Sequence, residues 1–89
     1  MFPDLVALRK LTGTITITGV DAGGSKRAKI TLPHNYLVIG MPRVSTETTD
    51  AEVEVVNGGG NEFEVKAINN GASAQDVVIN YEVYVLVGV

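Results

Sequence analysis

Four carboxylates near the middle of the chain have the spacing that could most readily support chemistry. Glu52 and Glu54 alternate with apolar residues in AEVEVVN, and Glu62 and Glu64 do the same in EFEVKAIN. If these segments pair as strands, the four side chains lie on one face and could hold a divalent cation at a subunit interface. The alternative is a water-exposed face on which Lys66 and basic residues of neighbouring subunits relieve the repulsion between like charges. We favour the exposed face and predict no metal site.

Nucleophilic catalysis would need a serine or threonine beside His34, the one histidine of the chain, with an acidic residue to orient the imidazole. His34 follows Pro33 in a connecting segment, and Ser25, Ser45 and Ser73 all lie in turn-like contexts. A single histidine in a loop is typical of a surface residue. We therefore predict that the protein is not an enzyme.

The stretch GVDAGGSK contains the residue types of a phosphate-binding loop in the wrong order. A P-loop places lysine directly after its last glycine and then serine or threonine, at the start of a helix. Here Ser25 precedes Lys26 and no helical pattern follows, which indicates a turn. The sequence therefore predicts no bound cofactor.

Composition restricts the class of partner. The chain has 89 residues, no cysteine and a net charge of −3 from seven basic and ten acidic residues. A nucleic-acid-binding protein usually carries a basic stripe, so we expect no nucleic acid. No apolar run reaches the roughly 20 residues of a membrane span, and the start lacks the features of a signal peptide. These features predict synthesis in the cytoplasm and no membrane partner.

Alternation of apolar and polar residues along most of the chain predicts β-strands. Threonine and isoleucine alternate over 13–20, and the DAGGS turn would join this strand to 26–32 as a hairpin. AEVEVVN and EFEVKAIN predict a second hairpin around the glycine-rich NGGGN turn. In LVIGMPRV, Gly40 and Pro42 indicate a bend, a bulge or an edge position. The pattern predicts an all-β fold, a single antiparallel β-sandwich or barrel-like fold of about six strands.

The N-terminal residues follow a different pattern. Leu5, Leu8 and Leu11 have helical spacing, and Asp4 could cap the start of a helix. An isolated helix this short is marginal in water and needs a surface to lie against. We predict that residues 1–12 form an arm or a helical turn, and that residues 13–89 form the β-sandwich domain.

The last strand, in QDVVINYEVYVLVGV, has one alternate set of residues that is wholly apolar. The other set becomes apolar toward its end and consists of Asp76, Val78, Asn80, Glu82, Tyr84 and Leu86. A domain this small without disulfides usually needs another source of stability, and oligomerisation is the one that remains. Because tyrosine is enriched at subunit contacts, we predict that another subunit covers this end. The predicted docking residues are Phe2, Leu5, Leu8, Val78, Tyr84 and Leu86.

The order of elements from ITLPHNYLVIGMPRV to VVINYEVYVLV resembles the small six-stranded sandwich of H-type lectins and related distal domains of phage tail-fibre and other virion proteins. The resemblance rests on Pro42, Arg43 and Val44, on NEFEVKAIN with its Phe63, and on the final strand. It implies a trimer that binds amino sugars through loops at subunit contacts. The chain lacks the tryptophan of the family's last strand, so the resemblance assigns no sugar-contacting residue.

The chain is also similar to small phage or virus-like structural proteins, which are short, cysteine-free β domains with an apolar N-terminal arm. We therefore predict a non-enzymatic structural protein of a phage or virus-like particle, either a capsid decoration or cement protein or a fibre or tail component. In the virion it would form a homo-oligomer, with a trimer favoured, and bind other virion proteins through apolar surface and β-edge contacts. The alternative is an oligomeric lectin-like module whose glycan contacts the loop of His34, Asn35 and Tyr36.

Overall fold

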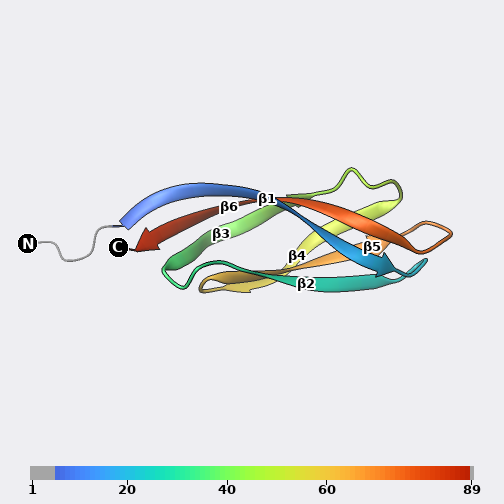
Figure 1. Cartoon of the computed structure of the whole chain (residues 1–89), viewed down its shortest axis with the longest axis horizontal. Helices are drawn as coiled ribbons and strands as arrows, with labels where there is room; N and C mark the ends of the chain where they lie inside the picture. Colours follow the sequence, from blue (N-terminus) through green and yellow to red (C-terminus); the bar gives the residue numbers. More distant parts are fainter. Residues whose placement is uncertain (1–5, 89) are drawn as a thin grey trace, which may run out of the picture.

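The protein is an all-β sandwich in the computed structural model, which describes residues 6–88 (Figure 1). The six strands are β1 (Val6–Val20), β2 (Ser25–Thr31), β3 (Tyr36–Ser45), β4 (Ala51–Gly59), β5 (Glu62–Asn69) and β6 (Gln75–Gly88). They form two antiparallel sheets, which we call sheet A, in the order β1-β6-β3, and sheet B, in the order β2-β5-β4. The predicted fold class is confirmed.

The core lies between the two sheets because each strand turns its apolar set inward. Phe63, Val65 and Ala67 of β5 face the buried residues of β6, and all three are fully or almost fully buried. Burying one valine, isoleucine or phenylalanine side chain contributes roughly 1.5–3 kcal/mol. The Phe63 and Tyr81 rings add an edge-to-face contact, with centroids 5.6 Å apart at 70°. The inner faces therefore hold the sandwich together.

Because Gly13 has no side chain, the Tyr81 ring can lie against it on the inner face of sheet A. Gly13 lies opposite Tyr81 in the β1–β6 register, and a Cβ at Gly13 would overlap the Tyr81 ring. A glycine within a strand often marks such a close approach. The Tyr81 side chain can therefore lie across β1 while its edge contacts Phe63.

The predicted hairpin between 13–20 and 26–32 is wrong. β1 pairs with β6 and β2 pairs with β5, so the chain crosses from sheet A to sheet B through 21–24. Gly23 donates its N–H to the Asn69 carbonyl, and Asn69 donates its own to the Gly24 carbonyl, at 2.8 and 2.9 Å. These bonds attach the crossing to the end of β5. Alternation alone does not separate the two connections, because both leave the apolar residues facing inward.

The predicted start of the first strand is also wrong. β1 begins at Val6, so residues 6–12 pair with β6 instead of forming an arm or a helical turn. Leu8 is exposed on one face, whereas Leu11 packs against the core on the other. Strand pairing with β6 therefore outweighs the helical spacing of the leucines. Residues 1–5, with the predicted docking residues Phe2 and Leu5, lie outside the described residues.

The hairpin of β4 and β5 and the irregularity of β3 agree with the sequence. In the hairpin Val53 pairs with Ala67, and Glu54 pairs with Lys66. β3 is an edge strand of sheet A, and its register with β6 shifts between Ile39 and Arg43. Gly40, within this bulge, has a φ of 71°, a backbone conformation that favours glycine.

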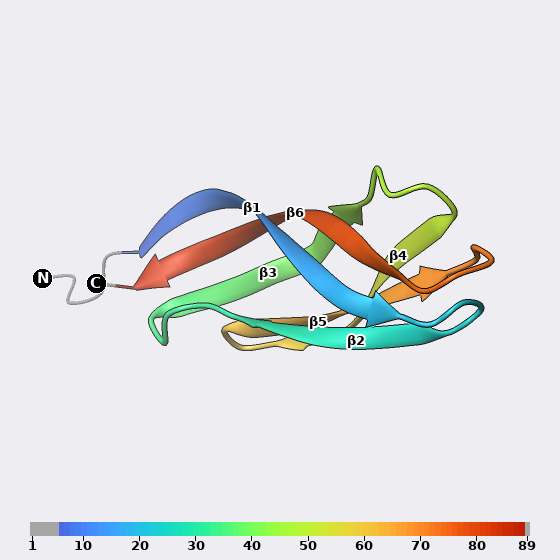
Figure 2. The same ribbon diagram turned by 45° about the vertical axis from the view of Figure 1, so that its right-hand side comes forward.

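Sheet A is longer than sheet B at the end where residues 6 and 88 lie. The start of β1 and the end of β6 reach past the ends of β2, β4 and β5 in both views (Figures 1 and 2). We call residues 6–10 and 84–88 the overhang. Ala7 and Arg9, which share the inward-facing set of β1, are exposed there. The β1 part of the overhang therefore projects beyond sheet B, whereas Val85 of β6 is fully buried and Val87 packs against the core.

Candidate assembly surface

The outer face of the overhang is apolar apart from Lys10, which pairs with Tyr84. The β-sheet register aligns Leu8, Leu86 and Leu37 in one row across β1, β6 and β3, and the next row contains Tyr84 and Ile39. Leu8, Leu37 and Tyr84 are 63%, 48% and 46% exposed, and the other two are half-buried. We call these five residues the terminal patch: Leu8, Leu37, Ile39, Tyr84 and Leu86. They come from all three strands of sheet A and form one continuous surface.

The remainder of the same outer face is polar. Glu82 lies between Thr12 and Arg43 in the next row, and Asn80 accepts a hydrogen bond from the Thr14 hydroxyl in the row after that. Lys10 Nζ lies 3.9 Å from a Glu82 oxygen, at the border between the two regions. The contiguous apolar surface therefore lies at one end of the sheet, and on β6 beyond it Val78 is an isolated apolar residue.

The structure brings together three of the predicted docking residues, Leu8, Tyr84 and Leu86. Val78 does not join them, because it pairs with Thr16 about 20 Å along β6 from Tyr84. Its backbone N–H and carbonyl bond instead to the hydroxyls of Thr48 and Thr46. Val78 is therefore outside the terminal patch, although it is 39% exposed.

Sequence reasoning missed the contribution of β3 to the terminal patch. Leu37 and Ile39 belong to an unbroken apolar run, in which alternation does not show which residues face outward. Pairing with β6 decides this, since Leu37 lies opposite Leu86 and Ile39 lies opposite Tyr84. The apolar run itself was the available signal, because a strand buried on one face alone would carry polar residues at these positions.

The outer face of sheet B carries the four predicted carboxylates, of which three form ion pairs within the chain and Glu52 accepts a hydrogen bond from Asn70. The ion pairs are Arg27–Glu64 at 3.5 Å, Lys29–Glu62 at 3.6 Å and Lys66–Glu54 at 4.0 Å. The strand β2 supplies two of the three cations, so neighbouring subunits are not needed to relieve the repulsion. No group of three or more metal-ligating side chains occurs among the residues that the structure describes.

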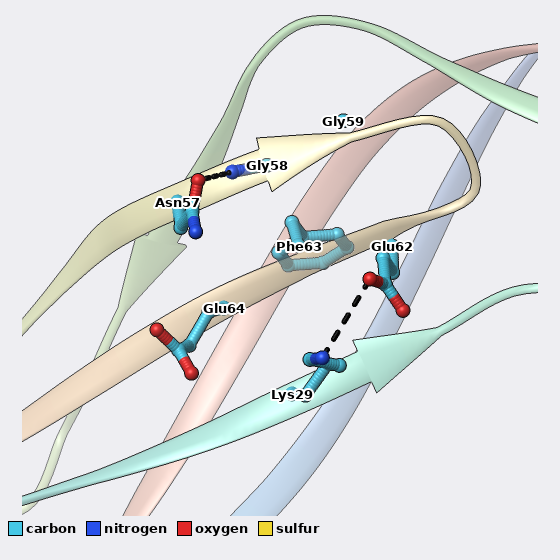
Figure 3. A pocket seen from close by; sticks show the side chains of 7 residues that line it. All are labelled: Lys29, Asn57, Gly58, Gly59, Glu62, Phe63 and Glu64. Atoms are coloured by element: carbon cyan, nitrogen blue, oxygen red, sulfur yellow. Dashed lines mark hydrogen bonds and ion pairs between the residues drawn. The ribbon is translucent and has the colours of Figure 1, made fainter.

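A shallow hollow lies where the outer face of sheet B meets the β4–β5 turn (Figure 3). Its lining combines charged side chains with the exposed glycine backbone of β4. The residues that line it are Lys29, Asn57, Gly58, Gly59, Glu62, Phe63 and Glu64. The Lys29–Glu62 ion pair crosses its floor in Figure 3.

The predicted ligand loop closes onto the end of β6. The Asn35 side-chain amide donates to the Gly88 carbonyl at 3.0 Å, and the Gly88 N–H donates to the Asn35 carbonyl at 2.8 Å. Tyr36 packs against the core, whereas His34 is exposed. Of the three predicted ligand residues, His34 and Asn35 are therefore exposed, and the Asn35 side chain is bonded to the end of β6.

No serine lies beside His34. Ser25 begins β2 and Ser45 ends β3, so both lie at the end of the sandwich opposite the 32–35 loop, and Ser73 lies in the β5–β6 connection at that same end. The ten residues of β3, about 30 Å in an extended strand, separate Ser45 from that loop. The structure does not assemble the serine–histidine arrangement that nucleophilic catalysis would use.

A buried asparagine closes the end of the sandwich opposite the overhang. The Asn69 side chain donates to the carbonyls of Val20 and Ser73, and its Oδ1 accepts from Gly71 N–H and from the Gln75 amide, all within 2.8–2.9 Å. Asn69 has no exposed surface. Sequence reasoning missed it, because NNG reads as a turn in which either asparagine could be exposed.

All four edge strands carry features that hinder pairing with another chain, and in β1 these are Arg9 and Lys10 near its start and a register shift after Ile17. β2 carries Lys26, Arg27 and Lys29, β4 has a bulge between Val55 and Asn57, and β3 has its bulge at Gly40 and Pro42. Charges, bulges and proline are the usual protection of a sheet edge. In β1, residues 11–18 have no charge, no proline and no irregularity in their pairing with β6 over 11–17. The edge of β1 is therefore the least protected.

No family model, curated protein or solved structure matches this chain. The resemblance to H-type lectins and to virion proteins remains a prediction. Within residues 6–88 the structure contains no helix long and apolar enough to cross a membrane.

Proposed function

We propose that this chain is a non-enzymatic structural subunit that assembles through the terminal patch and the edge of β1. The observation that carries the proposal is the exposure of Leu8, Leu37 and Tyr84 side by side on a regular sheet. Contiguous apolar surface on a soluble protein usually marks an interaction site. Because strand pairing fixes these side chains, they can be covered without first ordering a loop.

The composition of the patch suits a protein partner. Leucine, isoleucine and tyrosine gain free energy when water is excluded, at about 25 cal/mol for each Å² of apolar surface buried. A tyrosine at the centre supplies a large ring, and tyrosine is enriched in the buried centres of interfaces. Lys10 and Glu82, at the border of the patch, provide the polar rim that such contacts have.

The edge of β1 offers a second mode of contact. An extended segment of another chain can add to a free sheet edge through main-chain hydrogen bonds, with side chains supplying selectivity. Residues 11–18 provide such an edge, and it runs directly into the overhang at residues 6–10. One partner could therefore cover both surfaces.

The particle we propose is a phage or virus-like particle, in which the chain acts as a decoration, cement, fibre or tail component. The support for this choice is the likeness in composition and strand pattern described above. In this proposal the chain forms a homo-oligomer, with a trimer favoured, and the oligomer binds other virion proteins.

A matched pair of substitutions tests the role of the patch. Leu8→Lys and Thr14→Lys place the same charge on the outer face of the same strand, one inside the patch and one outside it. We expect Leu8→Lys to lower the mass in sedimentation velocity to that of a single chain. Thr14→Lys should retain the wild-type distribution. Equal behaviour of the two variants would reject the patch as the assembly surface.

A glycan-binding role is the second candidate, and the observation that favours it is Tyr84. This ring is 46% exposed and lies beside Lys10, which is within 3.9 Å of Glu82. A sugar could stack on the ring while the two charged side chains bond its hydroxyls. On a glycan array, Tyr84→Ala should abolish binding and His34→Ala should not. Loss of glycan binding in His34→Ala alone would instead place the glycan site in the 34–36 loop.

A further inference from the structure

The chain contains two Asn-Gly pairs, Asn57–Gly58 and Asn70–Gly71, in different surroundings. In an Asn-Gly pair the glycine amide nitrogen can attack the asparagine side-chain carbonyl carbon, because glycine has no side chain to obstruct the approach. Whether it does so in a folded protein depends on where that nitrogen points. The hydrogen bonds of the two pairs differ in this respect.

At the first pair, the attacking group faces its target. The Gly58 N–H donates to Asn57 Oδ1 of the preceding residue at 2.9 Å, which places the nitrogen beside the carbon that bears this oxygen (Figure 3). Asn57 follows a bulge in β4, on the exposed edge of sheet B. Gly59 and Gly60 follow, and a Cβ at either would meet nothing within 4 Å. No neighbouring atoms therefore crowd the side of the backbone next to this pair.

At the second pair, both groups are engaged elsewhere. The Gly71 N–H donates to the side chain of Asn69, not of Asn70, at 2.8 Å. The Asn70 amide donates to a Glu52 carboxylate oxygen at 2.9 Å, and the Asn70 backbone N–H donates to the Asp50 carbonyl at 2.7 Å. Because Asn69 is fully buried, the Gly71 nitrogen is held away from the Asn70 carbonyl.

We propose that Asn57 is a site of spontaneous deamidation in the folded protein and that the fold protects Asn70. The Gly58 nitrogen loses its proton and bonds to Asn57 Cγ, the Cγ–N bond of the amide breaks, and ammonia leaves with that proton. The product is a five-membered cyclic imide. Water then opens the ring at either carbonyl and leaves aspartate or isoaspartate at position 57.

The new carboxylate would form in a row of charges across sheet B. The register places Asn57 opposite Glu64, and Glu64 opposite Lys29. Asn57, Glu64 and Lys29 all line the hollow shown in Figure 3. Like charges directly opposite in a sheet are destabilising. Deamidation at Asn57 therefore weakens the β4–β5 hairpin, and isoaspartate weakens it further by adding a carbon to the backbone.

The test is peptide mapping by mass spectrometry after incubation of the intact folded chain at mildly alkaline pH. Because misplacing reacting groups by 1 Å can cost roughly 100-fold in rate, we expect Asn57 to convert at least about tenfold faster than Asn70. In concentrated denaturant the two rates should become similar, since both pairs are Asn-Gly. Equal rates in the folded protein, faster conversion of Asn70, or no conversion at all would overturn the proposal. So would a difference that persists in denaturant.

Two variants complete the test. A Cβ added by Gly58→Ala would meet the Phe63 Cβ at 3.5 Å, an ordinary contact, so this variant should fold and deamidate several-fold more slowly at Asn57. Asn57→Asp reproduces one product and should unfold at a lower denaturant concentration than Asn57→Gln. An unchanged rate in Gly58→Ala contradicts the proposed attack, and equal stability of the position 57 variants contradicts the proposed consequence.

Discussion

The outer faces of the two sheets meet water in different ways. On sheet B, three ion pairs connect neighbouring strands, and the outer face of β5 is charged except at the half-buried Ile68. On sheet A, the half near Asn80 is similarly polar, but the overhang exposes Leu8, Leu37 and Tyr84. Sheet B is thus suited to solvent over its whole length, and sheet A is suited to solvent over only part of it.

Inward burial therefore does not explain the apolar content of β6. Val83 and Val85 are buried against sheet B, while Tyr84 and Leu86 alternate with them on a face that has no second layer. The strands β1 and β3 add leucine and isoleucine beside the same two residues. This agreement among three strands is the support for the contact surface that we propose.

The largest loss of stability should come from a substitution on the inner face of the sandwich. Phe63→Ala removes a buried ring that contacts Tyr81, and we expect it to lower the free energy of unfolding by about 3–5 kcal/mol. Tyr84→Ala, measured in dilute solution by the same denaturant titration, should cost less than about 1 kcal/mol. Similar losses for both would remove the distinction between inner and outer residues.

The next effect concerns the polar end of the sandwich, whose hydrogen bonds are satisfied within the chain. Asn69→Ala leaves the Val20 and Ser73 carbonyls and the Gly71 N–H without their partner. We expect a loss of at least about 2 kcal/mol of unfolding free energy, since each buried group without a partner costs about 1–3 kcal/mol. The exposed neighbour provides the control, and Asn70→Ala should cost much less. A much smaller loss of stability in Asn69→Ala would mean that the hydrogen bonds of Asn69 do not hold this end of the sandwich together.

The smallest change in stability should come from a substitution on the outer face of sheet B. Lys29→Gln breaks the exposed 3.6 Å pair with Glu62 and should change stability by less than about 1 kcal/mol. It should also leave the mass in solution unchanged. Leu37→Gln, on the exposed face of sheet A, should lower that mass while altering stability little. If assembly depended on Lys29 and not on Leu37, the contact would lie on sheet B and not on sheet A.

The sequence predicted the strands better than their partners. Alternation locates the inward residues of β5, such as Phe63 and Val65, because burial on one face repeats every second residue. It does not distinguish a hairpin from a crossing between sheets, so the connection at 21–24 was assigned incorrectly. The start of β1 was missed because its partner, the end of β6, lies more than 70 residues away in the chain.

The candidate site was predictable only in part, for a related reason. Tyr84 and Leu86 stand out within a single strand, because their set changes from polar to apolar along it. Leu37 and Ile39 become members of the terminal patch only when β3 is placed beside β6 in register. Val78 has the same parity as Tyr84 but lies too far along the strand to join it. Membership of the patch therefore depends on pairing, which the pattern within one strand does not contain.

We expect the exposed apolar end of sheet A to be covered by another molecule, in the first instance by a second copy of this chain. Multi-angle light scattering of the unmodified chain across a dilution series measures this association. We predict a mass that is a multiple of the single-chain mass at micromolar concentration and that falls on dilution. A mass equal to one chain at every concentration, including the highest attainable, would contradict it.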